Sequence, residues 1–254
     1  MPRLRLFSTP AIVLRRVDYG EADRLLTLLT PTRGLVRAIA KGARRITSRK
    51  AGHIELFARA HVLLAQGRNF DVLTQAELIE PHQRLREDVL RGSLAHYFCE
   101  LVEQFAPEYA DSSALFDLLA EGLLWLCDVA DPLLTARAFE MRLLTLEGYR
   151  PELFRCVQTG EPLPETVPAA FSPQLGGVLS RKAAEHCRDA RPISAAALSL
   201  LRVLQTQRPE VWQQLHPEAA LHDELERITQ AYWHHILERR LRSQAMVHQV
   251  AQGR

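Results

Sequence analysis

The hydrophobic positions of the first 80 residues come in short runs separated by turns. Apolar runs of this length, bounded by Gly, Pro and Asp, are typical of β-strands. The runs predict five strands, at residues 11–16, 23–30, 35–41, 54–66 and 70–77. Five short strands in so few residues favour a small closed barrel such as an OB-fold, although the pattern alone leaves an SH3-like barrel open.

The pattern changes to a helical period after Pro81. Apolar residues three and four apart predict helices at residues 83–105, 114–129, 132–147, 194–207 and 218–247. Residues 149–192 carry six of the 14 prolines and a Gly-Gly pair, which predicts a long irregular loop. We therefore expect an α+β protein, with an OB-fold β-barrel domain at residues 1–80 and an all-α helical domain at residues 81–254.

The charge of the chain is uneven along its length. The net charge is +2, yet residues 1–80 carry 14 Lys and Arg against 7 Asp and Glu, whereas the remainder carries 18 against 23. A basic first domain and an acidic second domain suggest different partners for the two.

The basic charge is concentrated in residues 33–50, and no acid occurs between Arg24 and Ile54. If residues 35–40 form a strand, the basic side chains lie on one face and the small apolar ones on the other. Guanidinium groups grip phosphate with two parallel hydrogen bonds, and each such contact releases counterions, so the stretch predicts a nucleic-acid site. The alternative is a strand edge protected by charge. The candidate DNA-binding residues are Arg33, Arg37, Lys41, Arg44, Arg45, Arg49 and Lys50.

Motifs for catalysis are missing from the sequence. It contains no GxxxxGK[ST], HExxH or GxSxG, and no GxGxxG after a strand, so we expect that the protein is not an enzyme. The acidic cluster Asp18, Glu21 and Asp23 leaves a metal-dependent nuclease as an alternative. The four cysteines suggest no disulfide framework, and no apolar run is long enough for a signal peptide or a membrane span, so we expect a cytoplasmic protein.

Three segments occur in a specific order. DYGEADRLLTLLTPTRGLVRAIAKGARR (residues 18–45) is followed by SRKAGHIELFARAHVLL (48–64) and LTQAEL (73–78). This order resembles the N-terminal half of the RecO family of bacterial recombination mediators. The resemblance is clear over residues 8–80 and weaker over the helices. It implies an N-terminal OB-fold followed by a helical domain.

The resemblance also implies a function in DNA repair and homologous recombination. Family members bind single- and double-stranded DNA and anneal complementary strands without ATP. They associate with RecR and with the acidic C-terminal tail of single-strand-binding protein, and help to load RecA. Of the family's basic surface, the matching positions here are Lys41, Arg44 and Arg45; the other four candidates follow from charge and spacing alone. A second hypothesis is a protein adaptor that binds acidic C-terminal tails and has little affinity for DNA.

One departure from the family lies in the long loop. Many members carry a CxxC…CxxC zinc site there, but this sequence keeps only Cys156, and the other three positions hold Thr159, Ser180 and Ala183. One thiolate cannot make a tetrahedral zinc site, so we expect a degenerate zinc-finger region without a metal cofactor. A rearranged site that uses His186 and Cys187 is the alternative. Without zinc, we expect the loop to be held by packing of Phe154, Phe171 and Leu179.

Overall fold

The computed structural model describes residues 5–46, 48, 50–164, 169–238 and 241–252. The chain forms two compact units, Met1–Asp128 together with Ser243–Arg254, and Val129–Arg242. The first unit therefore holds the strands of the barrel and the helices that directly follow them. The second unit holds most of the remaining helices and a small sheet.

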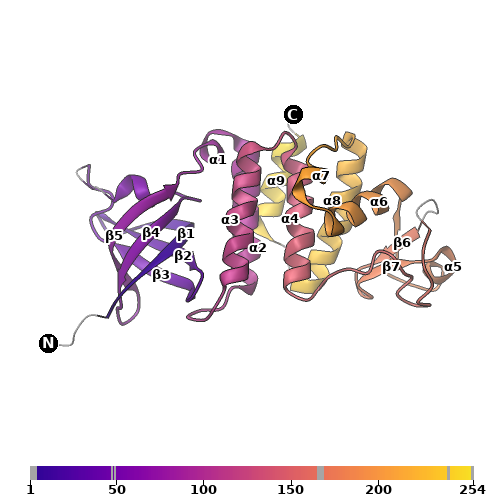
Figure 1. Ribbon diagram of the computed structural model, residues 1–254, viewed down its shortest axis with the longest axis horizontal. Helices are drawn as coiled ribbons and strands as arrows, with labels where there is room; N and C mark the ends of the chain where they lie inside the picture. Colours follow the sequence, from indigo (N-terminus) through magenta and orange to yellow (C-terminus); the bar gives the residue numbers. More distant parts are fainter. Residues whose placement is uncertain (1–4, 47, 49, 165–168, 239–240, 253–254) are drawn as a thin grey trace. The chain divides into compact units, whose positions relative to one another are not determined.

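Five strands of the first unit form a closed barrel (Figure 1). They are β1 (Leu6–Tyr19), β2 (Asp23–Thr30), β3 (Gly34–Ala40), β4 (Arg59–Ala65) and β5 (Asp71–Glu80). The order around the barrel is β1-β2-β3-β5-β4, and β4 pairs back to β1. Strands β3 and β5 run parallel, while the other neighbours are antiparallel. The barrel confirms the five-stranded fold that the hydrophobic pattern predicts.

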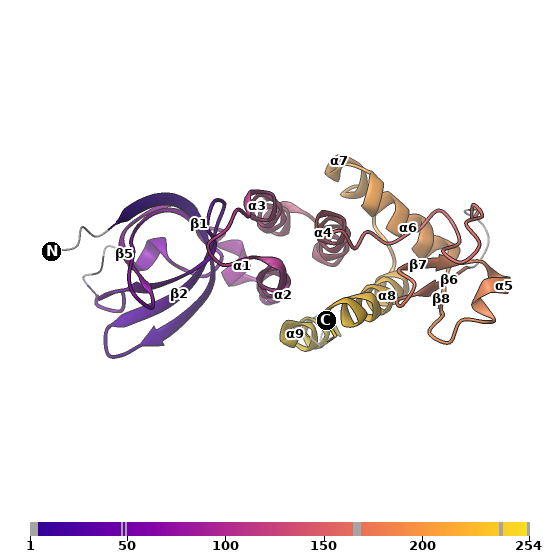
Figure 2. The ribbon, with the colours of Figure 1, turned by 90° about the horizontal axis from the view of Figure 1, so that it is seen from below.

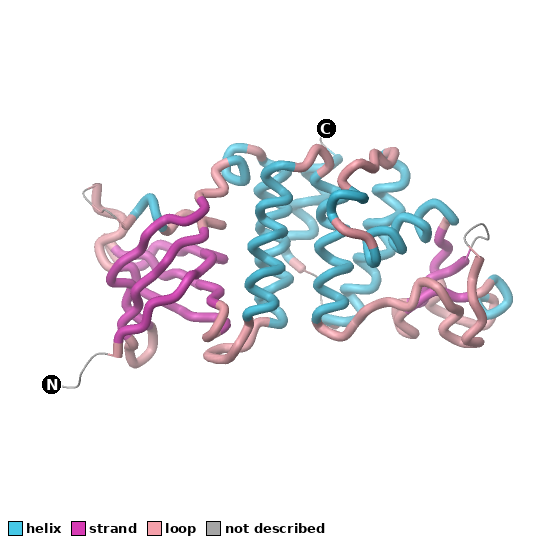
Figure 3. The backbone as a smooth tube through the Cα atoms, viewed as in Figure 1, coloured by secondary structure: helices cyan, strands magenta, loops and turns pink. Residues whose placement is uncertain are grey.

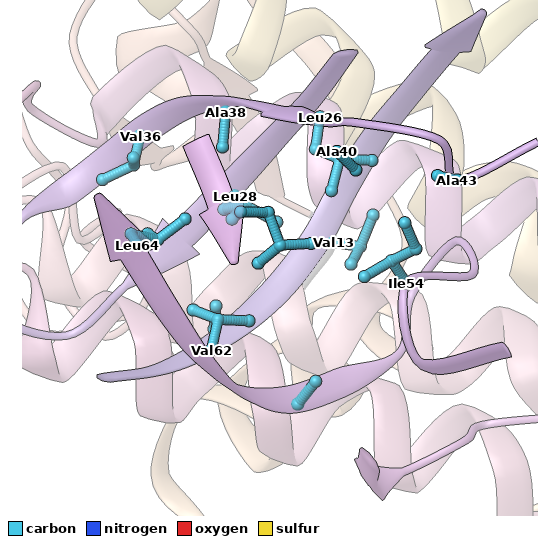
Figure 4. Packing of buried hydrophobic residues seen from close by; sticks show 13 residues of the cluster. Val13, Leu26, Leu28, Val36, Ala38, Ala40, Ala43, Ile54, Val62 and Leu64 are labelled. Atoms are coloured by element: carbon cyan, nitrogen blue, oxygen red, sulfur yellow. The ribbon is translucent and has the colours of Figure 1, made fainter. Parts of the chain in front are cut away.

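Small aliphatic side chains fill the interior of the barrel (Figure 4). On β3, Val36, Ala38 and Ala40 are buried while Arg37 is exposed, which confirms the predicted alternation. A barrel of five strands has little internal space, and this explains the use of alanine at interior positions. The other strands contribute Val13, Leu26, Leu28, Val62, Leu64 and Leu73 to the same interior.

The strands β1 and β4 differ most from their predicted ranges. Strand β1 is longer than residues 11–16, because it pairs with β4 at its start and with β2 at its end. Strand β4 begins at Arg59 rather than at residue 54. The preceding residues include a 3₁₀ turn, η1 (Ala51–His53), and Phe57 has a φ of 67°. Ile54 and Phe57 are buried, so their hydrophobicity reflects core packing rather than strand pairing.

Three helices follow the barrel in the first unit. The predicted helix at 83–105 is wrong in one respect: it is split into α1 (Arg84–Glu87) and α2 (Val89–Phe105). Asp88 between them is extended, and its carboxylate accepts the N–H of Arg91 at 3.0 Å, so it caps the second helix. Helix α3 (Ser113–Asp128) lies where the pattern predicts it.

The second unit begins with α4 (Pro132–Leu146), whose Asp131 cap accepts the N–H of Leu134. It continues with α6 (Ala195–Thr206), α7 (Pro209–Trp212) and α8 (Ala219–Leu237). Helices α4, α6 and α8 pack against one another (Figure 2). None of the helices in the described residues is long and apolar enough to cross a membrane.

The single helix predicted at 218–247 is wrong. Helix α8 ends where Glu238 adopts a left-handed conformation, with a φ of 51°. The chain forms a further helix, α9 (Arg242–Gln252), most of which belongs to the first unit. There the N–H and hydroxyl of Ser243 donate to a carboxylate oxygen of Glu100 at 2.8 and 2.5 Å.

The segment at 149–192 is only partly irregular, which corrects the predicted loop (Figure 3). It contains β6 (Ala169–Ser172), β7 (Gly177–Leu179) and α5 (Arg181–Ala184), and β8 (Arg191–Ile193) begins at its end. The strands form a sheet in the order β7-β6-β8. Strands of three or four residues are too short to give a hydrophobic period, so the sequence pattern does not reveal them.

The turn between β4 and β5 depends on a glycine. A Cβ atom on Gly67 would lie 1.9 Å from the carbonyl oxygen of Phe70. The N–H of Gly67 also donates to the carboxylate of the buried Asp71 at 3.0 Å. This close backbone approach sets where β5 begins, and therefore where the barrel closes.

We expect Gly67→Ala to lower the free energy of unfolding by about 1–3 kcal/mol, because the added methyl group must displace backbone. Gly52→Ala is the matched control, since a Cβ atom there meets nothing within 4 Å. Calorimetric unfolding of both variants tests this. Equal stability of the two variants would show that the turn does not need glycine.

Candidate nucleic-acid interface

An open groove of about 820 Å³ lies on the outside of the barrel. Its walls are formed by described residues of the loop that follows β3, between positions 41 and 53, and by β1, β4 and β5. We call it the basic groove, because three cationic side chains and one carboxylate line it. The lining residues are Ser8, Lys41, Gly42, Arg45, Ser48, Lys50, His53, His61, Val62, Leu63, Thr74, Gln75, Ala76 and Glu77.

Hydrogen bonds hold the loop along β5. The ammonium group of Lys50 donates to the carbonyl oxygen of Leu73 at 3.1 Å. The N–H of Leu78 donates to Nδ1 of His53 at 3.0 Å. At the start of the loop, the N–H of Gly42 donates to the carboxylate of Asp23 at 2.8 Å. The loop is therefore anchored near both ends, and three of its basic residues, Lys41, Arg45 and Lys50, line the groove.

The structure brings together three of the seven candidate DNA-binding residues. Lys41 and Arg45 are exposed in the basic groove, and Lys50 is half-buried in it. Arg44 does not line the groove. Its guanidinium group donates to the carbonyl oxygens of Gly20 and Glu21 at 3.2 and 3.3 Å. Arg44 therefore joins the loop to the β1–β2 hairpin.

Two further candidates, Arg33 and Arg37, do not line the basic groove. The guanidinium carbon of Arg33 is 3.7 Å from the ring centre of Phe7, which makes a cation–π contact. Arg37 is exposed on β3 and lies 3.6 Å from the carboxylate of Glu108. Arg49 falls outside the described residues.

Sequence reasoning missed the polar residues that β1, β4 and β5 contribute to the groove. Ser8 Oγ and His61 Nδ1 lie 3.5 Å apart on neighbouring strands, and Thr74 lies on β5. Each is an isolated polar residue in a strand, which usually indicates only a solvent-facing position. The strand register, rather than any local motif, brings them beside the basic loop.

Two carboxylates of the acidic cluster near residue 20 make ion pairs and a hydrogen bond within the barrel. Asp18 pairs with Arg24 and Arg44 at 3.7 and 3.3 Å, and Asp23 accepts the N–H of Gly42. In the part of the chain that the structure describes, no three His, Cys, Asp or Glu side chains gather so as to hold a metal ion. The geometry therefore gives no support to the nuclease hypothesis.

The residues at the positions of the family's zinc ligands do not fit zinc. Ala183 has no ligand atom, and the Ser180 hydroxyl already accepts the N–H of Ala183 at 3.3 Å. The Cys156 thiol lies 3.8 Å from the Ser180 hydroxyl and accepts the Ser180 N–H at 3.4 Å. In the alternative arrangement, the Cys187 thiol donates to the carboxylate of Asp189 at 3.0 Å. Neither set supplies four ligands.

Apolar packing occupies the zinc-site region instead. Cys156 and Ala183 belong to one buried cluster with Ala170 and Leu179. Burial raises the pKa of the Cys156 thiol, but hydrogen bonds from the Thr159 hydroxyl and from the N–H groups of Ser180, Thr159 and Gln158 lower it to about 7. The expected packing of Leu179 and of Phe171 is confirmed, since both are buried. Phe154 is 41% exposed and packs only in part, with the guanidinium carbon of Arg202 at 5.1 Å from its ring centre.

Comparison with known proteins gives two family matches. Residues 4–82 match the family model "Recombination protein O N terminal", and residues 86–245 match "Recombination protein O C terminal". The DNA repair protein RecO of Roseiflexus sp. (strain RS-1) is 44% identical over 250 residues, which cover 98% of this chain and 88% of that protein. The DNA repair protein RecO of Desulforudis audaxviator is 41% identical over 245 residues, 96% of this chain and 97% of that protein.

The fold and the groove define an OB-fold protein whose barrel carries a basic outer surface and is followed by a helical domain. With both family models matched and relatives of this similarity, the particular family is settled. The chain belongs to the RecO family of DNA repair proteins.

The lowered pKa of Cys156 predicts a pH-dependent stability. The folded state holds the thiolate between pH 7 and 9, where a thiol of ordinary pKa 9.0 is still protonated, so wild-type stability should rise with pH over this interval. We expect the stability difference between wild type and Cys156→Ala to grow by up to about 2 kcal/mol from pH 7 to pH 9. Denaturant unfolding at several pH values measures it. Cys187→Ala, which keeps Cys156, should follow the wild-type profile, and a difference independent of pH would refute the thiolate.

We further propose that the second unit folds without a metal, because the four positions cannot hold one. Treatment with EDTA, followed by thermal unfolding and metal analysis, should leave the unfolding midpoint unchanged. A lowered midpoint that added zinc restores would contradict this.

Proposed function

We propose that the basic groove binds the phosphate backbone of single- and double-stranded DNA. The supporting observation is the position of Lys41 and Arg45, which are exposed at the rim of a groove whose loop is fixed at both ends. Each cation that neutralises a phosphate releases condensed counterions, and this gain does not depend on sequence. His53 and His61 add further hydrogen-bonding groups to the wall.

We propose that this binding serves strand annealing in homologous recombination. Annealing needs two polyanions to approach each other, and a surface that neutralises phosphates lowers their repulsion. Annealing of this kind does not require ATP, and this agrees with the lack of a P-loop motif in the sequence. In this role the protein binds and positions DNA rather than acting as an enzyme, and it works in the cytoplasm. Family membership supports association with RecR and with the acidic C-terminal tail of single-strand-binding protein, which leads to loading of RecA.

The adaptor hypothesis has one observation in its favour. Leu63 and Ala76 lie among the cations of the basic groove, so an acidic peptide with an apolar end would also fit there. A peptide that binds while DNA does not, at low salt, would favour this second function.

Charge reversal in the groove tests the proposal. We expect Lys41→Glu/Arg45→Glu to weaken binding of single-stranded DNA about tenfold or more, because two phosphate contacts become repulsive. The slope of log affinity against log salt should become shallower by about 1.4, since about 0.7 counterion is released for each contact on a single strand. Fluorescence anisotropy at several salt concentrations measures both, and annealing of complementary labelled oligonucleotides without ATP should fall in parallel.

The matched control is Arg181→Glu/Lys182→Glu, which makes the same change of net charge at exposed positions of α5 in the second unit. Equal loss of affinity in the two double variants would show that only net charge matters. Unchanged affinity in the groove variant would rule out the groove as the binding surface.

A further inference from the structure

An apolar row crosses the outer face of the barrel from β1 to β5. The register pairs Val17 with Leu25, Leu25 with Ile39, and Ile39 with Val72. Because side chains alternate along a strand, these four residues share the outer face, opposite to the buried interior positions. We call them the apolar strip. Val17 is 54% exposed and the others are half-buried.

A second apolar row on the same face is covered by helices. Ile12 pairs with Leu29, and Leu29 pairs with Leu35. Ile12 and Leu29 are fully buried, and helices α2 and α3 contact β1 and β2. The helices of the first unit therefore cover one part of the face and leave the apolar strip open.

Two aromatic rings meet beside the strip. Tyr19, at the end of β1, and Phe70, in the β4–β5 turn, have ring centres 6.5 Å apart at an interplanar angle of 66°. Tyr19 is 47% exposed, and Phe70 is half-buried. The two rings are far apart in the sequence, and the closure of the barrel places them together.

Cations lie on both sides of the strip. On one side, the register places Arg15 and Arg37 in one row with Thr27 between them. Their side chains are 61% and 63% exposed, and each lies 3.6 Å from one carboxylate, of Glu103 and Glu108 respectively.

On the other side, the strip continues into the basic groove. Thr74 follows Val72 by two positions on β5, so both fall on the same face. Lys41 is the first residue after β3, two positions beyond Ile39. Both Lys41 and Thr74 line the groove. The apolar strip is therefore one surface with the proposed DNA-binding site.

We propose that the apolar strip, with Tyr19 and Phe70, holds the unpaired bases of a single DNA strand whose phosphates contact the basic groove. This inference rests on the proposed function and adds the means of distinguishing single strands from duplexes. Unpaired bases present apolar faces that stack on aromatic rings, whereas bases in a duplex are already stacked on each other. A ligand with planar apolar groups and a regular negative charge matches an apolar strip between two sets of cations.

Three probes at fixed salt test the inference: (dT)20, a 20-mer of abasic sites with the same phosphate charge, and a duplex hairpin. Wild type should bind (dT)20 more tightly than the abasic strand. In Tyr19→Ser/Phe70→Ser we expect the affinity for (dT)20 to fall about 10- to 100-fold, to the level of the abasic strand, because the stacking surfaces are lost. Affinity for the hairpin and for the abasic strand should change less than twofold.

The conservative variant Tyr19→Phe/Phe70→Tyr keeps both rings and should keep the wild-type preference. Circular dichroism of each variant confirms folding. Equal losses for (dT)20 and for the hairpin, or no loss for either, would overturn the inference while the groove proposal stands. Loss of binding by an acidic peptide that ends in Phe, with (dT)20 unaffected, would also overturn it. A wild type that binds none of the three probes would refute the proposed function itself.

Discussion

The short parallel pairing of β3 with β5 closes the barrel, and the proposed binding surfaces depend on it. Ala38 pairs with Asp71 and Ile39 pairs with Val72. Because β5 continues beyond this contact, its later residues lie beside the loop that follows β3. It also joins Val72 to the outer row that begins on β1. Closure of the barrel thus builds the groove wall and the apolar strip in one step, and it removes the free strand edges.

The basic loop contains cations of two kinds. Arg44 is occupied by the carbonyl oxygens of Gly20 and Glu21 and by the carboxylate of Asp18. Lys41 and Arg45 are exposed over the groove. The cations of this loop repel one another, and hydrogen bonds from Arg44 and Lys50 to backbone oxygens hold the loop in place. We therefore propose that Arg44 positions the loop, whereas Lys41 and Arg45 contact the DNA.

Local patterns in the sequence were enough to predict the barrel, the alternation on β3 and the helix start at Asp131. They failed where a single residue breaks a helical period, as at Asp88 and Glu238, because the apolar spacing continues across the break. The charge run identified Lys41 and Arg45 but could not separate them from Arg44. Pairing between strands that are distant in the sequence places His61 in the groove and brings Tyr19 next to Phe70. The hydrophobic pattern of one sequence does not reveal which residues of distant strands pair.

We propose that the degenerate zinc-finger region of the second unit is held together without a metal ion. A structural zinc ion contributes folding free energy by joining distant loop segments. Here the buried Arg202 does so instead: Nε donates to the carbonyl oxygen of Leu153 at 2.8 Å, and a terminal nitrogen donates to that of Leu163 at 3.0 Å. Cys156 bonds to Ser180, which caps α5. The Arg202 guanidinium group, the hydrogen bond to the Cys156 sulfur and the apolar packing together hold these loop segments. In a zinc finger, four metal–ligand bonds would do so.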